Sequence, residues 1–305
     1  MRLSVIICTH SPRPHYFNRT LEALRAQTLP KDQWELLVID NRSTDPLQDR
    51  TDLSWHPDSR IVREETLGLT PARLAGIKGA KGELFVFVDD DNVLDEDYLE
   101  QALKIAQAHP FLGAWSGQCR GGFEKPPAEW TRRYWGNLVI REFDRDVWSN
   151  LPRLGETMPC GAGMVVRAAA AREYLRLTET GERGFQLDRA GGSLLSGGDN
   201  DLAACAIDIG MGMGLFTALK LTHLIPPERF TEAYLSKLAE GIYISSVVLA
   251  HVRGDQAELA SYRVRRRDWV RAMMHRGPHR TIQLAAVRGR QKGFEFIASM
   301  GTDAA

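Results

Sequence analysis

The chain of 305 residues carries 39 basic and 39 acidic side chains, so its formal net charge is zero at pH 7. This balance does not predict a polyanionic partner, and no nucleic-acid-binding motif accompanies it. Hydrophobic residues make up 43% and charged residues 26% of the chain, as in an ordinary globular protein. The length allows about two domains, or one large α/β domain with an appendage.

Four cysteines lie far apart and show no C-x-x-C spacing: Cys8, Cys119, Cys160 and Cys205. This argues against a disulfide framework or a zinc site and favours reduced, intracellular thiols. The apolar stretch at the N-terminus is too short for a signal peptide, and no apolar run of about 18 residues follows. We therefore expect a cytoplasmic protein, with the inner face of the membrane as an alternative location.

Apolar strands alternate with helical patterns along the first half of the chain. Strands are expected at 3–9, 34–41, 61–65 and 83–89, and helices at 16–28, 70–82 and 95–109. Later segments predict a strand turning into a helix at 161–177, a Gly loop opening a helix at 196–210, a strand at 215–226 and a helix at 231–250. This alternation indicates an α/β fold with a Rossmann-like, mostly parallel sheet flanked by helices.

Polar residues follow three of the expected strands, at Thr9-His10, Asp40-Asn41 and Asp89-Asp90-Asp91. Ligands of open α/β sheets bind outside the carboxyl ends of the strands. We therefore expect these residues to line one crevice.

The stretch FVFVDDDN, residues 85–92, ends a buried strand in three consecutive aspartates. Adjacent carboxylates repel each other, which raises their pKa values, and a divalent cation would neutralise them. In an extended segment Asp89 and Asp91 point the same way and can share a site, while Asp90 faces elsewhere. The alternative is an acidic turn that is merely solvated.

Three segments carry a resemblance to the inverting GT-A glycosyltransferases of family 2. VIICTHSPRP…LEALRAQT resembles the family's opening strand and helix, and LLVIDNRSTD resembles its second strand and loop. EETLGLTPARLAGIKGAKGELFVFVDDDN is similar to the family's run from a Gly-Leu-Ser/Thr turn to the D-x-D motif. The likeness covers about 3–235, and it implies a GT-A catalytic domain over 1–228, with a nucleotide-binding half at 1–112 and an acceptor-binding half at 113–228. Residues 229–305 would form a helical, basic C-terminal extension.

The resemblance implies roles for the polar residues at the strand ends. Asp91 would bind Mg²⁺ or Mn²⁺ on the diphosphate of a nucleotide-sugar donor, with Asp89 near the ribose or the metal's waters. Asp40 would hydrogen-bond a uracil-type base, although Asp also favours turns. The expected donor-binding set is Thr9, Asp40, Arg73, Asp89, Asp90 and Arg229, in which Arg73 could instead form a structural ion pair with Asp89.

The segment SGGDNDL is expected to supply the general base that deprotonates an acceptor hydroxyl. The family pattern is Gly-Glu-Asp-x-Asp/Glu-Leu, which places the base at Asp199 and the later acid at Asp201. Gly198 stands where the family has Glu, and this departure puts the local assignment in doubt. The alternative is that Asp199 or Asn200 only caps the following helix.

Two later residues are further candidates. His223 occupies a place where many family members carry a histidine near the diphosphate and the metal, but a lone histidine in an apolar strand is also an ordinary core residue. Arg229 could close on the diphosphate from a loop, or be a plain surface arginine.

The stretch YRVRRRDWVRAMMHRGPHR, residues 262–280, is strongly basic and carries a single acid, Asp268. It suits anionic headgroups or a lipid-linked acceptor, and the alternative is a solvated helix face. The sequence as a whole predicts a metal-dependent transferase that moves a sugar from a UDP-sugar to a hydroxyl of a glycan or lipid-linked acceptor, with inversion. A nucleotidyltransferase and a non-catalytic sugar-nucleotide or glycan-binding relative remain alternatives.

Overall fold

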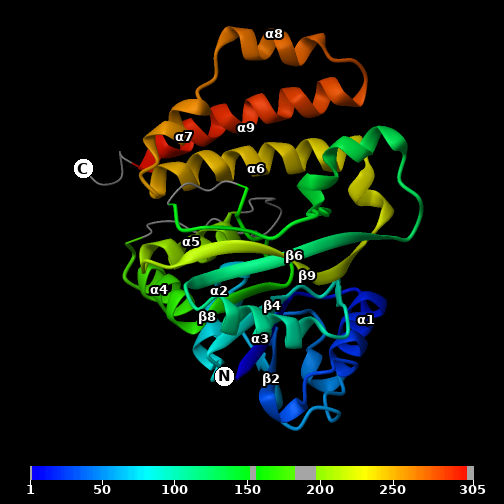
Figure 1. Cartoon of the computed structure of the whole chain (residues 1–305). Helices are drawn as coiled ribbons and strands as arrows, with labels where there is room; N and C mark the ends of the chain where they lie inside the picture. The colour runs from blue at the N-terminus through cyan, green and yellow to red at the C-terminus, as the bar shows by residue number, and fades with distance from the viewer. Residues whose placement is uncertain (1, 152–155, 183–196, 301–305) are drawn as a thin grey trace. The chain divides into compact units, whose positions relative to one another are not determined.

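The computed structural model describes residues 2–151, 156–182 and 197–300 (Figure 1). Its described residues form two compact units. Of the described residues, the first unit contains 2–122, 139–151, 156–182 and 199–225, and the second contains 123–138, 197–198 and 226–300. Sequence patterns placed 123–138 in the first domain, but this segment clusters with the C-terminal helices because it packs on helix α6 (Glu232–Val252).

The first unit is built on a mixed sheet. Its parallel part has the strand order β3-β2-β1-β4, formed by Ser59–Arg63, Trp34–Asp40, Leu3–Thr9 and Leu84–Val88. These are the four strands expected from the apolar runs, and the bounds of β1 agree with the prediction.

Beyond β4 the strands run antiparallel to their described neighbours, so the parallel arrangement holds for only one part of the sheet. β8 pairs with β4, followed by β6, β9 and β5, while β7 pairs with β9; the five strands are Met164–Arg167, Leu112–Phe123, Gly212–Ile225, Asn92–Leu94 and Val147–Ser149. β5, β6 and β7 were not expected. β6 is rich in glycine, which is depleted in strands. Gly117 is needed there because a Cβ would lie 2.0 Å from the carbonyl oxygen of Leu219 in β9.

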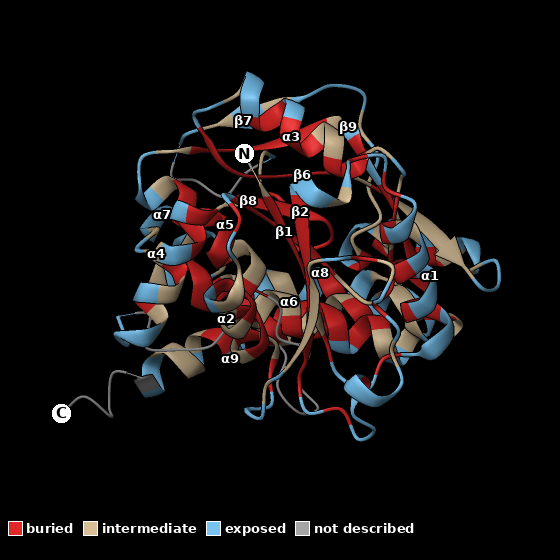
Figure 2. Ribbon diagram, turned by 90° about the horizontal axis from the view of Figure 1, so that it is seen from below, coloured by how far each residue is buried: buried red, intermediate tan, exposed pale blue. Residues whose placement is uncertain are grey.

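Helices cover both faces of the sheet, and the buried strands lie between them (Figure 2). Side chains of β1 alternate between the two faces, with Val5 and Ile7 in one cluster and Ile6 in the other. The first cluster is closed by α1 and α3, which span Pro14–Arg25 and Tyr98–Ala108. The second is closed by α2, α4 and α5, which span Leu69–Gly79, Ala168–Glu179 and Gly198–Asp208.

The second unit is helical. It contains η3, η4, α6, α7, α8 and α9, which span Glu129–Leu138, Pro227–Phe230, Glu232–Val252, Gln256–Ser261, Arg266–Met274 and Pro278–Met300. α6 and α9 pack closely because Gly289 has no side chain. A Cβ at this position would lie only 2.4 Å from the carbonyl oxygen of Glu240. The Glu240 carboxylate also pairs with Arg288 and Lys292 of α9. Among the described helices, α6 alone is long and apolar enough to cross a membrane, and 56% of its apolar window is buried within the structure.

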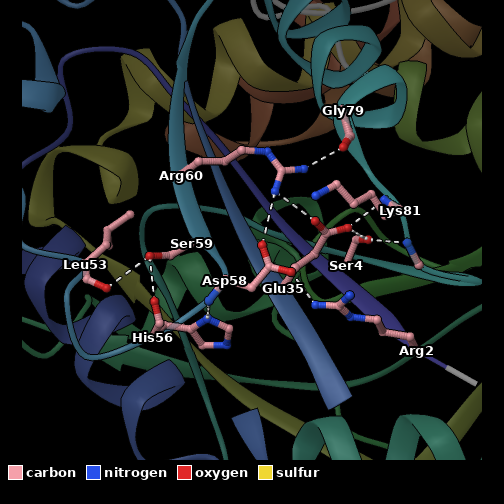
Figure 3. Close-up of polar contacts among 11 residues, drawn as sticks. Arg2, Ser4, Glu35, Leu53, His56, Asp58, Ser59, Arg60, Gly79 and Lys81 are labelled. Carbon is pink, nitrogen blue, oxygen red and sulfur yellow. Dashed lines mark hydrogen bonds and ion pairs between the residues drawn. The ribbon is translucent and has the colours of Figure 1, made fainter. Parts of the chain in front are cut away.

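A buried carboxylate joins the amino ends of the parallel strands (Figure 3). Glu35 of β2 is fully buried and accepts hydrogen bonds from the Ser4 hydroxyl at 2.5 Å, the Lys81 N–H at 2.6 Å and Arg60 at 2.9 Å. Burial alone would raise the pKa of Glu35, but these three donors outweigh it and lower the pKa below its ordinary value. The ionised carboxylate therefore fixes β1, β2, β3 and the approach to β4.

Replacing Glu35 by Ala should lower the free energy of unfolding by about 3 kcal/mol, because it leaves the Arg60 guanidinium and the Lys81 N–H without their acceptor. Urea unfolding followed by circular dichroism measures this loss. Glu100→Ala, which removes the exposed ion pair with Lys104, is the matched control and should leave stability nearly unchanged. Equal losses in the two variants would contradict this assignment.

The stabilising effect of Glu35 should depend on pH in one direction. Its pKa is lowered from 4.5 by folding, so its contribution is present above that value and is lost as the pH falls through the folded-state pKa. The difference in unfolding free energy between wild type and Glu35→Gln should be constant from pH 7 to about pH 5 and shrink below it. A difference that grows on acidification would reverse the sign of this linkage.

Candidate functional site

Hydrogen bonds join the loops that follow β1 and β2. The His10 Nδ1 lies 2.7 Å from the Asn41 carbonyl oxygen, and the Ser11 N–H donates to Ser43 Oγ at 2.8 Å. Ser11 and Arg42 have φ angles of 48° and 56°, which non-glycine residues rarely adopt. The two strand ends therefore form one polar edge, as the sequence predicts.

Asp40 organises the loop after β2. Its carboxylate is buried and accepts hydrogen bonds from the N–H groups of Ser43 at 2.9 Å and Leu47 at 3.0 Å, and from Arg63 at 2.9 Å. Burial would raise the pKa of Asp40, but hydrogen bonds from Ser43, Leu47 and Arg63 lower it. The turn-stabilising alternative is thus present in the structure, and contact with a base stays a prediction.

Asn41 has a structural role that the sequence pattern did not single out. Its side-chain amide donates to the carbonyl oxygens of Glu64 at 3.3 Å and Thr66 at 2.7 Å, and its oxygen accepts from the Gly68 N–H at 2.8 Å. Gly68 has a φ of 141° and precedes α2. Asn41 therefore fixes the start of the helix that carries Arg73; its position directly after a strand was the available signal.

The three aspartates lie in a turn rather than in an extended segment. β4 ends at Val88, and the Asn92 N–H donates to the Asp89 carbonyl oxygen at 3.0 Å. The expected extended backbone at Asp89–Asp91 is therefore wrong, whereas a site shared by Asp89 and Asp91 stays a prediction. Asp90 faces the end of β1, where its carboxylate accepts a hydrogen bond from the Thr9 hydroxyl.

Asp91 and His223 lie together. The Asp91 Oδ2 is 3.3 Å from the His223 Nε2, and both residues are buried. The contact follows from the antiparallel pairing of β5 with β9, in which Asn92 lies opposite His223. Asn92 also donates from Nδ2 to Asp91 Oδ1 at 3.0 Å, which orients the carboxylate.

This pair has the chemistry of a partial metal site. Two neighbouring ligands of an octahedral Mg²⁺ lie about 3 Å apart, close to the observed separation of Asp91 and His223. No group of three or more His, Cys, Asp or Glu side chains suited to a metal occurs in the part of the chain that the structure describes. A cation at Asp91 would thus need further oxygen ligands from a substrate or water.

Asp89 and Asp91 both lie near Cys119 of β6. Burial is the main cause that raises the pKa of the Cys119 thiol, and Cys160, Asp91 and Asp89 raise it further. Cys119 is thereby kept as a neutral thiol. The Cys160 N–H donates to Ser116 Oγ of β6 at 3.2 Å, so the segment that begins at Cys160 lies against the strand that carries Cys119.

Asp199 reaches this segment from the first turn of α5. Its Oδ2 accepts a hydrogen bond from the Gly161 N–H at 2.9 Å, and its Oδ1 accepts one from the Asn200 N–H at 3.0 Å. Helix α5 begins at Gly198, so Asp199 lies inside its first turn, where the helix dipole favours a carboxylate. The carboxylate therefore does more than cap the helix, because it also bonds to a distant loop.

Arg73 of α2 lies at the same place. A Cβ built on Gly161 would be 2.9 Å from Asp199 Oδ2 and 3.4 Å from Arg73 Nη2. Arg73 is buried, as is Asp201 in the first turn of α5. The structure thus brings together a partly exposed carboxylate and a buried guanidinium, with no side chain at Gly161 to separate them.

Arg141 is a further basic residue near this segment that the sequence pattern did not indicate. Its guanidinium donates to Ser116 Oγ at 3.0 Å and to the Met158 carbonyl oxygen at 3.2 Å, and its buried Nε has no hydrogen-bond partner. It lies in an irregular stretch without a recognisable motif, so no sequence signal was available. Arg229 lies in η4 of the second unit, and its role in donor binding stays a prediction.

Comparison with known proteins assigns this chain to a family. The family model described as "Glycosyl transferase family 2" matches residues 4–175. The putative glycosyltransferase EpsH of Bacillus subtilis is 34% identical over 93 residues, covering 30% of this chain and 26% of that protein. The poly(ribitol-phosphate) beta-N-acetylglucosaminyltransferase TarS of Staphylococcus aureus is 30% identical over 112 residues, covering 36% of this chain and 19% of TarS. The chain thus matches about a quarter or less of the length of these relatives.

Solved structures of S. aureus TarS share the fold. TarS 1–349 aligns with a TM-score of 0.54 and 16% identity, covering 98% of this chain and 92% of that one. Its complex with UDP-GlcNAc aligns with a TM-score of 0.52 and 16% identity, covering 97% and 92%. The expected GT-A fold, with C-terminal helices, is confirmed. Because the family model spans more than half of the 305 residues, this chain belongs to glycosyl transferase family 2.

Proposed function

We propose that this protein is a metal-dependent glycosyltransferase that moves one sugar from a nucleotide sugar to a hydroxyl of a glycan or lipid-linked acceptor. The observation that carries the proposal is the contact between Asp91 and His223 at 3.3 Å, in the same unit as Asp199 and Arg73. A carboxylate and an imidazole at the end of a buried strand offer a divalent cation two ligands, and Asp199 offers a base. The leaving diphosphate of the donor needs the cation, and the acceptor hydroxyl needs the base.

Asp91 and His223 would hold Mg²⁺ or Mn²⁺, with Asp89 close by. The bound cation would supply positive charge that stabilises a leaving nucleoside diphosphate. Asn92 keeps the Asp91 carboxylate oriented through its hydrogen bond at 3.0 Å. Such a cation would be completed by diphosphate and water oxygens, as is usual for Mg²⁺ sites with few protein ligands.

Asp199 would act as the general base. Its Oδ1 and Oδ2 are held by the N–H groups of Asn200 and Gly161, and each oxygen keeps a further lone pair for a substrate proton. The acceptor oxygen would bond to the anomeric carbon as its proton passes to Asp199 and the bond from that carbon to the diphosphate breaks. Attack from the face opposite the diphosphate would invert the anomeric centre in one displacement. Asp201 is the second candidate for this role.

A UDP-sugar is the proposed donor. The TarS structures that share the fold include complexes with UDP and with UDP-GlcNAc. On this chain Thr9, Asp90 and Asp40 would form the nucleotide side of the site, with Asp40 shaping the loop against the base through the bonds to Ser43 and Leu47. Arg73 would counter charge on the diphosphate side, and Arg229 would close on the diphosphate.

A non-catalytic sugar-nucleotide-binding protein is the competing function. Gly198 stands where a Glu was expected, which removes one acid from the first turn of α5. The contact of Asp199 with Gly161 favours catalysis, because it holds a carboxylate next to Arg73 that a pure binding site would not need. Turnover measurements separate the two functions.

The direct test incubates wild type with a panel of nucleotide sugars, with Mn²⁺, Mg²⁺ or EDTA, and measures released nucleotide. We expect one donor to be hydrolysed slowly and only with metal. Asp199→Asn should bind this donor with unchanged affinity and lose at least about 100-fold in turnover. His223→Ala should require more metal for half-maximal rate, because it removes one of two expected ligands.

Glu100→Gln, at a half-buried residue of α3 outside the candidate site, serves as the control and should match wild type. Turnover that is unaffected by EDTA would refute metal dependence. Donor binding without turnover in the wild type would favour the non-catalytic protein.

Gly161→Ala provides a test from the opposite direction, because it adds a group beside the base instead of removing the base. The new Cβ would lie 2.9 Å from Asp199 Oδ2, so the carboxylate must move. We expect turnover to fall at least about tenfold while donor affinity is retained, since misplacement of a catalytic group lowers the rate. Gly136→Ala, where a Cβ would meet nothing within 4 Å, is the matched control; equal turnover in both variants would place Asp199 outside the reaction.

A further inference from the structure

Helix α8 presents apolar side chains to solvent. Val270, Met273 and Met274 are 59%, 61% and 76% exposed. Their spacing of i, i+3 and i+4 places them on one side of the helix, while Ala272 faces inward and is buried. Three of the eight large hydrophobic residues that are exposed among the described residues thus lie on this one nine-residue helix.

The stretch that contains α8 is also basic. Residues 262–280 contain seven arginines, all of them exposed, at positions 263, 265, 266, 267, 271, 276 and 280. The one acid of this stretch, Asp268, accepts a hydrogen bond from the Arg265 N–H at 2.8 Å at the helix start. Because the whole chain has zero net charge, this stretch concentrates positive charge in one place.

The described helices of the second unit leave this face of α8 uncovered. α8 packs on α9, which lies between α8 and α6 (Figure 1). Arg263 lies over the Phe294 ring of α9 at 6.0 Å, and the Arg280 Nε donates to the His275 carbonyl oxygen at 2.9 Å. These contacts hold both ends of the α8 segment, so its outward side is presented by a fixed helix.

We propose that the outward face of α8, formed by Val270, Met273 and Met274 with Arg266, Arg267 and Arg271, docks on an anionic phospholipid bilayer. The guanidinium groups match lipid phosphates in charge and geometry. Each basic side chain near an anionic surface adds attraction, and apolar side chains beside them enter the boundary between headgroups and acyl chains. This inference does not depend on the proposed transferase activity.

The exposed apolar residues favour a bilayer over a water-soluble polyanion. Arginines alone would suit either partner, because both present phosphate or other anionic groups. Valine and methionine side chains gain nothing from a hydrated polymer, whereas burial of their apolar surface in a bilayer is favourable. A merely solvated helix face would not need three exposed apolar groups at this spacing.

Flotation of the full chain with vesicles tests the proposal, using phosphatidylglycerol mixed with phosphatidylcholine and phosphatidylcholine alone. Wild type should float with the anionic vesicles and remain behind with the neutral ones. The triple variant Arg266→Gln, Arg267→Gln, Arg271→Gln should partition about 100-fold more weakly. Val270→Ser, Met273→Ser, Met274→Ser should also weaken partitioning, by about tenfold or more.

Two control variants carry the same kinds of substitution at exposed residues outside α8. Arg19→Gln, Arg25→Gln, Arg50→Gln removes three exposed arginines of the first unit, and Phe111→Ser removes an exposed apolar side chain; both should float as wild type does. Equal loss of flotation in the Arg19 triple variant would overturn the proposal. A serine variant that floats unchanged and binds dextran sulfate as wild type does is the other contrary outcome. That outcome would overturn the bilayer proposal and identify a soluble polyanion as the partner.

Discussion

The antiparallel pairing of β5 with β9 is the constraint on which the proposed chemistry depends. It sets Asn92 opposite His223 and so brings the aspartate turn against a histidine more than a hundred residues later. The Leu224 N–H reinforces this register by donating to the Asp91 carbonyl oxygen at 2.8 Å. A shift of one residue would turn His223 to the other face of the sheet, and the two expected metal ligands would separate.

Much of the first unit follows from local patterns. Continuous apolar runs predict the buried parallel strands. The helices expected at 16–28 and 70–82 lie close to α1 (Pro14–Arg25) and α2 (Leu69–Gly79). Beyond β4 the pattern fails. β6 carries glycines where packing against β9 demands them, and such a segment has no period that distinguishes it from a loop. Strand direction there is decided by tertiary pairing, which single-sequence propensity does not encode.

The candidate site divides in a similar way. Motif and chain position were enough to predict four site residues. The structure places Asp91 beside His223, and Asp199 and Arg73 beside Gly161. The extended geometry assumed for Asp89–Asp91 failed because a turn follows Val88. Asn41 positions other segments through its bonds to Thr66 and Gly68. No sequence motif marks a residue with such a role. Such roles emerge only when distant loops meet.

The Glu35 network has an evolutionary consequence. It fixes the parallel strands at their amino ends, whereas the loops that carry the polar residues leave from the carboxyl ends of the same strands. Strand register at the amino ends therefore does not rely on those loops, and loop positions that hold no neighbouring segment, unlike Asn41, can change without cost to the frame. A lineage built on this scaffold can alter its polar edge while it inherits the same frame.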